Sequence, residues 1–133
     1  MDESYVLDTH ALIWYLEGDR RLGRSARSAL RDTANPIFLP VIALAEAVWL
    51  IERGRTGIPS VASLLSDVTL DARIIIVPLT RIIVEITTSL TTIDEMHDRQ
   101  IVATALHLTD TQPVRLLTRD ENITASRLVP TLW

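Results

Sequence analysis

Four acidic residues lie in contexts where an unpaired charge is costly to bury. They are Asp8, Glu46, Asp98 and Asp120. Asp8 ends the apolar run Tyr5–Leu7 and Asp120 follows Leu116–Arg119, so each is expected just after a buried strand. The alternative role for Asp8 is capping of a helix, and the alternative for Asp120 is a place in a solvated loop.

Glu46 is the only polar residue in the run Val41–Ile51, and its helical neighbours three and four residues away are apolar. Its alternatives are exposure to solvent or a buried pair with an arginine. Asp98 shares the apolar face of the predicted helix Met96–Leu108, which turns it inward or toward a cleft, with capping as the alternative. Two other acids of the same turn compete with it: Asp94 and Glu95.

These four acids come from distant segments and are expected to converge on one cleft, where their repulsion requires a hard divalent cation. The chain has no cysteine and no pair of histidines at metal-ligand spacing, which favours Mg²⁺ or Mn²⁺ over zinc. Such a cation keeps bound waters and bridges phosphate oxygens. Hydrolysis of a phosphodiester is therefore the natural reaction for the site.

Composition excludes several other classes of function. All thirteen basic residues are arginine, so phosphate-binding loops that need lysine and Schiff-base chemistry are ruled out. The 133 residues are 47% hydrophobic, as expected of one globular domain over residues 1–133. The absence of cysteine, of a basic N-terminal segment and of a long apolar run predicts a cytoplasmic protein that does not enter a membrane.

Alternating strand and helix patterns must position the acids. Strands are predicted at Ser4–Leu7, Ile37–Leu39, Arg73–Val77, Val114–Thr118 and Leu128–Trp133. Helices are predicted at His10–Leu16, Arg20–Asp32, Val41–Arg53, Pro59–Leu70, Leu79–Leu90 and Met96–Leu108. This order predicts an α/β fold of three layers, α/β/α, with a central, mainly parallel sheet. Sites in such sheets form at the carboxyl ends of strands, where Asp8 and Asp120 are expected.

Four motifs in order resemble the PIN-domain ribonucleases, and more narrowly the VapC-type toxins of bacterial toxin–antitoxin pairs. They are Tyr5–Trp14, the helix of Glu46 with Glu52–Gly54, Met96–Ala105 and Leu117–Asp120. The resemblance covers essentially the whole chain. It departs from many relatives at Ala43–Ala45, just before the acid of that helix, where they carry a more polar residue or a tryptophan.

The resemblance implies a single PIN-like domain that cleaves RNA with one or two Mg²⁺ or Mn²⁺ ions and leaves a 5′-phosphate and a 3′-hydroxyl. It implies that the four acids are the catalytic and metal-binding residues, with Asp8 and Asp98 the firmest ligands. Thr9 and Thr118 match small polar positions beside the site. A cognate VapB-like antitoxin and a second copy of the chain are the implied protein partners.

Arginines supply candidate contacts to the RNA backbone, because a guanidinium binds phosphate in a bidentate manner. Arg24 and Arg27 belong to a cluster within Arg20–Arg31, whose alternative role is a solvated helix face, and the net charge of −4 argues against bulk affinity for nucleic acid. Arg99 lies beside Asp98 and is a further candidate, with pairing on the helix surface as its alternative.

Two other functions compete with the ribonuclease toxin. One is a catalytically silent PIN-like module that binds RNA or protein, which the full set of four mutually repelling acids argues against. The other is a DNA-directed, structure-specific nuclease, which the absence of an appended duplex-binding segment disfavours. The RNA target is left open by the sequence, because RNA is recognised through loop geometry and shape.

Overall fold

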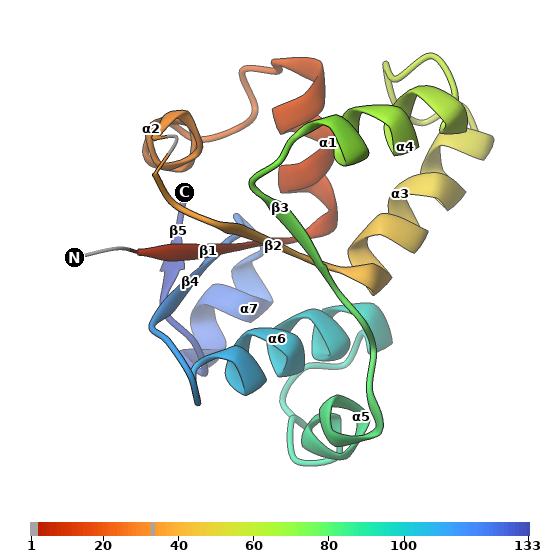
Figure 1. Ribbon diagram of the computed structural model, residues 1–133. Helices are drawn as coiled ribbons and strands as arrows, with labels where there is room; N and C mark the ends of the chain where they lie inside the picture. Colours follow the sequence, from red (N-terminus) through yellow and green to blue (C-terminus); the bar gives the residue numbers. More distant parts are fainter. Residues whose placement is uncertain (1–2, 33) are drawn as a thin grey trace.

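A parallel sheet forms the centre of the computed structural model, which describes residues 3–32 and 34–133 (Figure 1). Its strands are β1 (Ser4–Leu7), β2 (Ile37–Pro40), β3 (Ile74–Val77), β4 (Val114–Leu117) and β5 (Thr131–Leu132). They pair in the order β3-β2-β1-β4-β5, and every pairing is parallel. Strands β1 and β2 are buried throughout, which explains why they read as continuous apolar runs.

Helices cover the sheet and complete the three-layer α/β/α arrangement. They are α1 (Thr9–Glu17), α2 (Arg24–Arg31), α3 (Val41–Glu52), α4 (Val61–Leu70), α5 (Arg81–Thr87), α6 (Met96–Leu108) and α7 (Glu121–Ser126). In the view of Figure 1, α1, α2 and α4 lie above the sheet, whereas α5, α6 and α7 lie below it. The predicted fold class is confirmed. Within the described residues, no helix is long and apolar enough to cross a membrane.

Several elements differ from the sequence-based prediction. Strand β5 spans only Thr131–Leu132 instead of Leu128–Trp133, and α5 spans Arg81–Thr87 instead of Leu79–Leu90. Helix α7 was not predicted, because its six residues are too few to establish a hydrophobic period, and it begins at the cap that Asp120 provides. Helix α2 begins at Arg24 instead of Arg20. The preceding turn is held by Asp19, whose carboxylate accepts hydrogen bonds from the Arg21 amide and guanidinium.

Strand order changes direction at the middle of the sheet. From β1 the chain builds outward through β2 and β3 on one side, and β4 and β5 then fill the other side. Leu7 at the end of β1 pairs with Leu117 at the end of β4, and the Asp8 amide donates to the Leu117 carbonyl at 3.4 Å. Open α/β sheets form ligand crevices at such a switch point, beyond the carboxyl ends of the strands.

Candidate functional site

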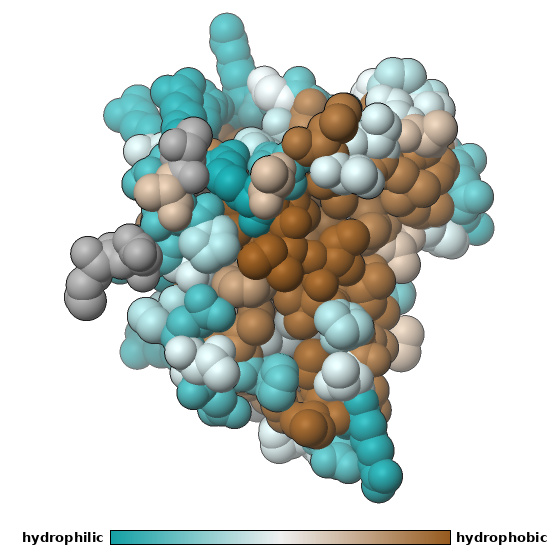
Figure 2. All heavy atoms as spheres, viewed as in Figure 1, coloured by the Kyte–Doolittle hydropathy of each residue, from teal (hydrophilic) through white to brown (hydrophobic). Residues whose placement is uncertain are grey.

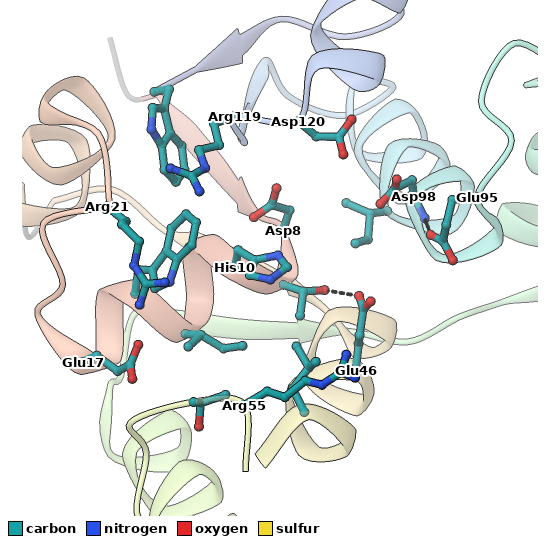
Figure 3. Close-up of a pocket in the computed structure, with 17 residues that line it drawn as sticks. Asp8, His10, Glu17, Arg21, Glu46, Arg55, Glu95, Asp98, Arg119 and Asp120 are labelled. Atoms are coloured by element: carbon teal, nitrogen blue, oxygen red, sulfur yellow. Dashed lines mark hydrogen bonds between the residues drawn. The ribbon is translucent and has the colours of Figure 1, made fainter. Parts of the chain in front are cut away.

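A cavity of about 730 Å³ lies at the carboxyl edge of the sheet, and all four predicted acids line it (Figure 3). Asp8 follows β1, Glu46 lies on α3, Asp98 lies on α6 and Asp120 follows β4. This volume falls in the range of small-molecule sites and exceeds what a metal ion alone would require. The cavity therefore has room for both a cation and part of a substrate.

Asp8 is held at the start of α1 by its own capping bond. Its Oδ1 accepts a hydrogen bond from the Ala11 amide at 2.8 Å. Burial raises the pKa of the Asp8 carboxyl, and the nearby Asp120 raises it further, although hydrogen bonds from Thr118 and Ala11 oppose the change. The capping role expected as an alternative is thus present, and the same side chain faces the cavity.

Asp120 has the same arrangement at the end of β4. Its Oδ1 accepts from the Ile123 amide at 3.0 Å and so caps α7, while its own amide donates to the Thr118 hydroxyl at 3.0 Å. Asp120 is partly buried and Thr118 is fully buried, whereas Arg119, Glu121 and Asn122 are exposed, so the expected alternative of a solvated loop describes this segment only in part.

Glu46 reaches the cavity from the middle of α3. Its Oε1 accepts a hydrogen bond at 2.5 Å from the hydroxyl of Thr9, which is buried at the first position of α1. The arginine pair and the fully solvated position expected as alternatives are not found among the described residues. The threonine hydroxyl supplies the donor that a partly buried carboxylate needs.

Asp98 lies in the first turn of α6, among several other carboxylates. Burial and the neighbouring carboxylates, with Asp120 and Glu95 the foremost, raise its pKa from the usual 3.8 to about 7. Glu95 caps α6 by accepting from the Asp98 amide at 2.7 Å. Burial raises the pKa of Glu95, but this bond and the hydrogen bonds to His97 outweigh burial and leave the pKa lowered.

None of the four predicted acids forms an ion pair within residues 3–32 and 34–133. In the same part of the chain, no three acidic or histidine side chains are grouped closely enough to hold one metal ion together. Mg²⁺ requires fewer protein ligands than this, since it commonly binds one or two carboxylates and completes its shell with water and substrate oxygens. The donor set therefore fits a hydrated Mg²⁺ or Mn²⁺ ion.

A basic and aromatic wall faces the acids across the cavity. Arg119 and Arg21 place their guanidinium carbons 4.4 and 4.9 Å from the ring centre of Trp14, whose ring lies 5.8 Å from that of Trp133. Both tryptophans and Arg55 also line the cavity. The sequence placed Arg21 in the cluster Arg20–Arg31 but did not single out Arg55 or Arg119, although Arg119 directly precedes Asp120 and could have been found by that adjacency.

Comparison with family models gives a match to the PIN domain over residues 5–127. The chain belongs to the PIN domain family. Comparison with curated protein sequences gives no match.

Solved structures with the same fold as this PIN domain include a toxin–antitoxin complex and a toxin. VapBC2 from Rickettsia felis, bound to a DNA fragment from its promoter, has 18% identity and a TM-score of 0.70 and matches 97% of each chain. A toxin–antitoxin complex from Klebsiella pneumoniae has 21% identity, a TM-score of 0.66 and 94% coverage of both chains. Mycobacterium tuberculosis VapC20, a toxin that cleaves the sarcin–ricin loop, has 17% identity and a TM-score of 0.67, covering 94% of this chain and 96% of its own.

The other arginines expected to contact substrate lie elsewhere in this PIN domain. Arg99 directs its Nε to the Ile93 carbonyl, and Arg27 donates to the Leu22 carbonyl at 3.0 Å. Arg24 is exposed at the start of α2. None of the three is among the described residues that line the cavity with the acids.

Proposed function

We propose that this PIN domain is a divalent-metal-dependent endoribonuclease and the toxin of a VapC-type toxin–antitoxin pair. The observation that carries the proposal is the convergence of four unpaired acids on one cavity at the switch point of the sheet. The raised pKa of Asp98 supports it, because that carboxylate is unfavourable until a cation compensates its neighbours. Such pKa changes are typical of functional sites.

Asp8 and Asp98 would hold a Mg²⁺ or Mn²⁺ ion, and Glu46 and Asp120, which line the same cavity, would orient water around it. When bound, the ion supplies a nucleophilic water at neutral pH and neutralises charge on the phosphodiester. The chain's own groups prepare this site. Thr9 fixes the Glu46 carboxylate by its hydrogen bond, and the capping bonds of Asp8 and Asp120 fix the other side chains without a positive partner.

An RNA substrate, an antitoxin and a second copy of the chain are the partners we propose. The antitoxin proposal is supported by the structural neighbours, several of which are toxin–antitoxin complexes. The homodimer proposal is supported by an apolar face around β3, which Figure 2 shows as a continuous hydrophobic area. Soluble monomers rarely expose large contiguous apolar patches.

The test is cleavage of total cellular RNA by the purified, partner-free protein with Mg²⁺, with Mn²⁺ or with EDTA. The matched variant is Asp98→Asn, which keeps the size of the side chain and removes its charge. We expect discrete bands that require metal and that fall at least about a hundredfold in the variant, the scale at which loss of a main catalytic group acts. Equal inertness of both proteins, with RNA binding retained, would instead favour a catalytically silent binding module.

A further inference from the structure

Acidic and basic side chains are unevenly distributed along the cavity, with Asp98 and Glu95 at its acidic end (Figure 3). Three arginines also line it: Arg21 and Arg119 on the opposite side, where Glu17 lies too, and Arg55 beside Glu46 (Figure 3). We name these the arginine arm: Arg21, Arg55 and Arg119.

Two members of the arginine arm, Arg55 and Arg119, are exposed and make no side-chain hydrogen bond or ion pair within the described residues. Arg119 is the one that lies over Trp14 and directly precedes Asp120, whereas Arg55 lies on the side of Trp49. Arg21 differs, since its Nε and Nη2 donate to Asp19 at 3.1 and 2.9 Å. That ion pair neutralises much of the charge of Arg21, whereas Arg119 forms no ion pair within the described residues and interacts with Asp19 only through space.

Trp14 holds Arg119 in place but is not itself a platform for a base. Its side chain is only 4% exposed, and two guanidinium groups already lie over its ring. A cation stacked on an indole keeps its N–H groups directed outward in the ring plane, where they are available to an acceptor. The wall therefore presents a fixed guanidinium to the cavity instead of an open aromatic surface.

We propose that Arg119, stacked on Trp14, binds the RNA phosphate next to the one that is cleaved. This inference rests on the proposed ribonuclease function. An RNA strand whose scissile phosphate lies at the acids also brings its adjacent phosphate close to them. The negative charge of the acids repels that second phosphate, so it requires a cationic side chain to bind it. Arg119 is joined directly to Asp120, which keeps it within one residue of one of the four acids, and its planar fork suits phosphate oxygens.

The test is filter binding of a short, labelled single-stranded RNA of mixed sequence to the whole protein in EDTA, over a range of salt concentrations. For single strands, the logarithm of the binding constant falls with the logarithm of salt by about 0.7 for each phosphate contact. We expect Arg119→Gln to reduce this slope by about 0.7 and to weaken binding about three- to tenfold at low salt. Arg119→Lys keeps the charge and is expected to retain the slope.

Arg81→Gln is the matched control, because it removes the same charge from a side chain on α5 that does not line the cavity. Its slope is expected to equal that of the wild type. An Arg119→Gln slope equal to the wild-type slope would overturn the inference, even if the protein cleaves RNA. Absence of cleavage by the wild type in Mn²⁺ would instead contradict the proposed function, and the binding comparison would still decide the role of Arg119.

Discussion

Single carboxylates in this protein serve two purposes at once. Asp8 and Asp120 each use Oδ1 to cap a helix, and the same two side chains line the cavity. Capping and metal binding looked like alternatives in the sequence, because an aspartate after a strand suits both roles. The capping bond also orients the side chain without placing a positive charge beside it. Residue types and spacing could thus locate these acids, but they could not show which carboxylate oxygen makes the capping bond.

Asp98 is expected to make metal-free stability depend on pH. Its folded pKa of about 7 exceeds the usual 3.8, so the folded protein retains a proton that the unfolded chain releases between these values. The contribution of the protonated Asp98 carboxyl to the free energy of unfolding is therefore fully present at low pH and is lost as the pH rises toward 7. Asp98→Asn should prevent this loss of stability, because asparagine does not ionise. The variant should be more stable than the wild type near pH 8 by up to about 4 kcal/mol, and solvent screening of the Asp98 charge makes the difference smaller.

Urea unfolding in EDTA at several pH values measures this effect. The stabilisation by Asp98→Asn should shrink toward zero near pH 3, where both folded and unfolded carboxyls are protonated. Asp110→Asn controls for the loss of one negative charge, since this acid is exposed and does not line the cavity. If Asp98→Asn stabilised the protein equally at every pH, the raised pKa of Asp98 would be contradicted.

At the scale of elements, most of the fold could be predicted, because the spacing of apolar residues distinguishes its strands from its long helices. The acids' convergence also followed from strand–helix alternation, since parallel strands bring their carboxyl ends to one edge. The arginine arm could not be predicted in this way. The cavity is lined from a turn by Arg21, from a loop by Arg55 and from the position after β5 by Trp133. No repeating sequence pattern predicts that these three segments come together.

Gly23, at the start of α2, should tolerate no side chain. A Cβ atom there would lie 2.4 Å from the backbone carbonyl carbon of Trp133 and 2.5 Å from its Cδ1. Because backbone must move, Gly23→Ala is expected to cost about 1–3 kcal/mol of stability, as overpacking does. It should also displace Trp133 from the cavity wall, which near-ultraviolet circular dichroism would detect.

Gly18→Ala provides the comparison, because Gly18 ends α1 at a φ of 65° with open space around it. Its cost is expected to be about 1 kcal/mol from backbone strain alone, with the tryptophan spectrum unchanged. If the two variants change the spectrum alike, the contact between α2 and Trp133 does not position the wall.

At the scale of the whole molecule, the edge strand β3 leaves one apolar face uncovered. Ile75 and Ile76 are 47% and 45% exposed although they lie within a strand, and Ile82 on α5 and Leu70 on α4 are 57% and 77% exposed. An edge strand of this kind invites pairing with another chain unless it is covered. A second copy of the chain is the occupant that we propose.

Light scattering of the purified protein is expected to give twice the mass of one chain. The double variant Leu70→Glu and Ile82→Glu should give a single chain, because two charges would be buried at the interface. Both positions are exposed in one copy, so the fold of each copy should persist. Thr124→Glu on α7 is the control, and monomeric wild-type protein would exclude the dimer.

The pairing of Trp14 with Trp133 gives the protein an optical probe of its own cavity. The chain has three tryptophans, and the third, Trp49, is 45% exposed on α3 with Arg53 stacked over it. In a Trp49→Phe protein, selectively excited tryptophan emission would therefore come only from the cavity wall. Its intrinsic fluorescence would follow, without any attached label, each ion or nucleotide that enters beside Arg119.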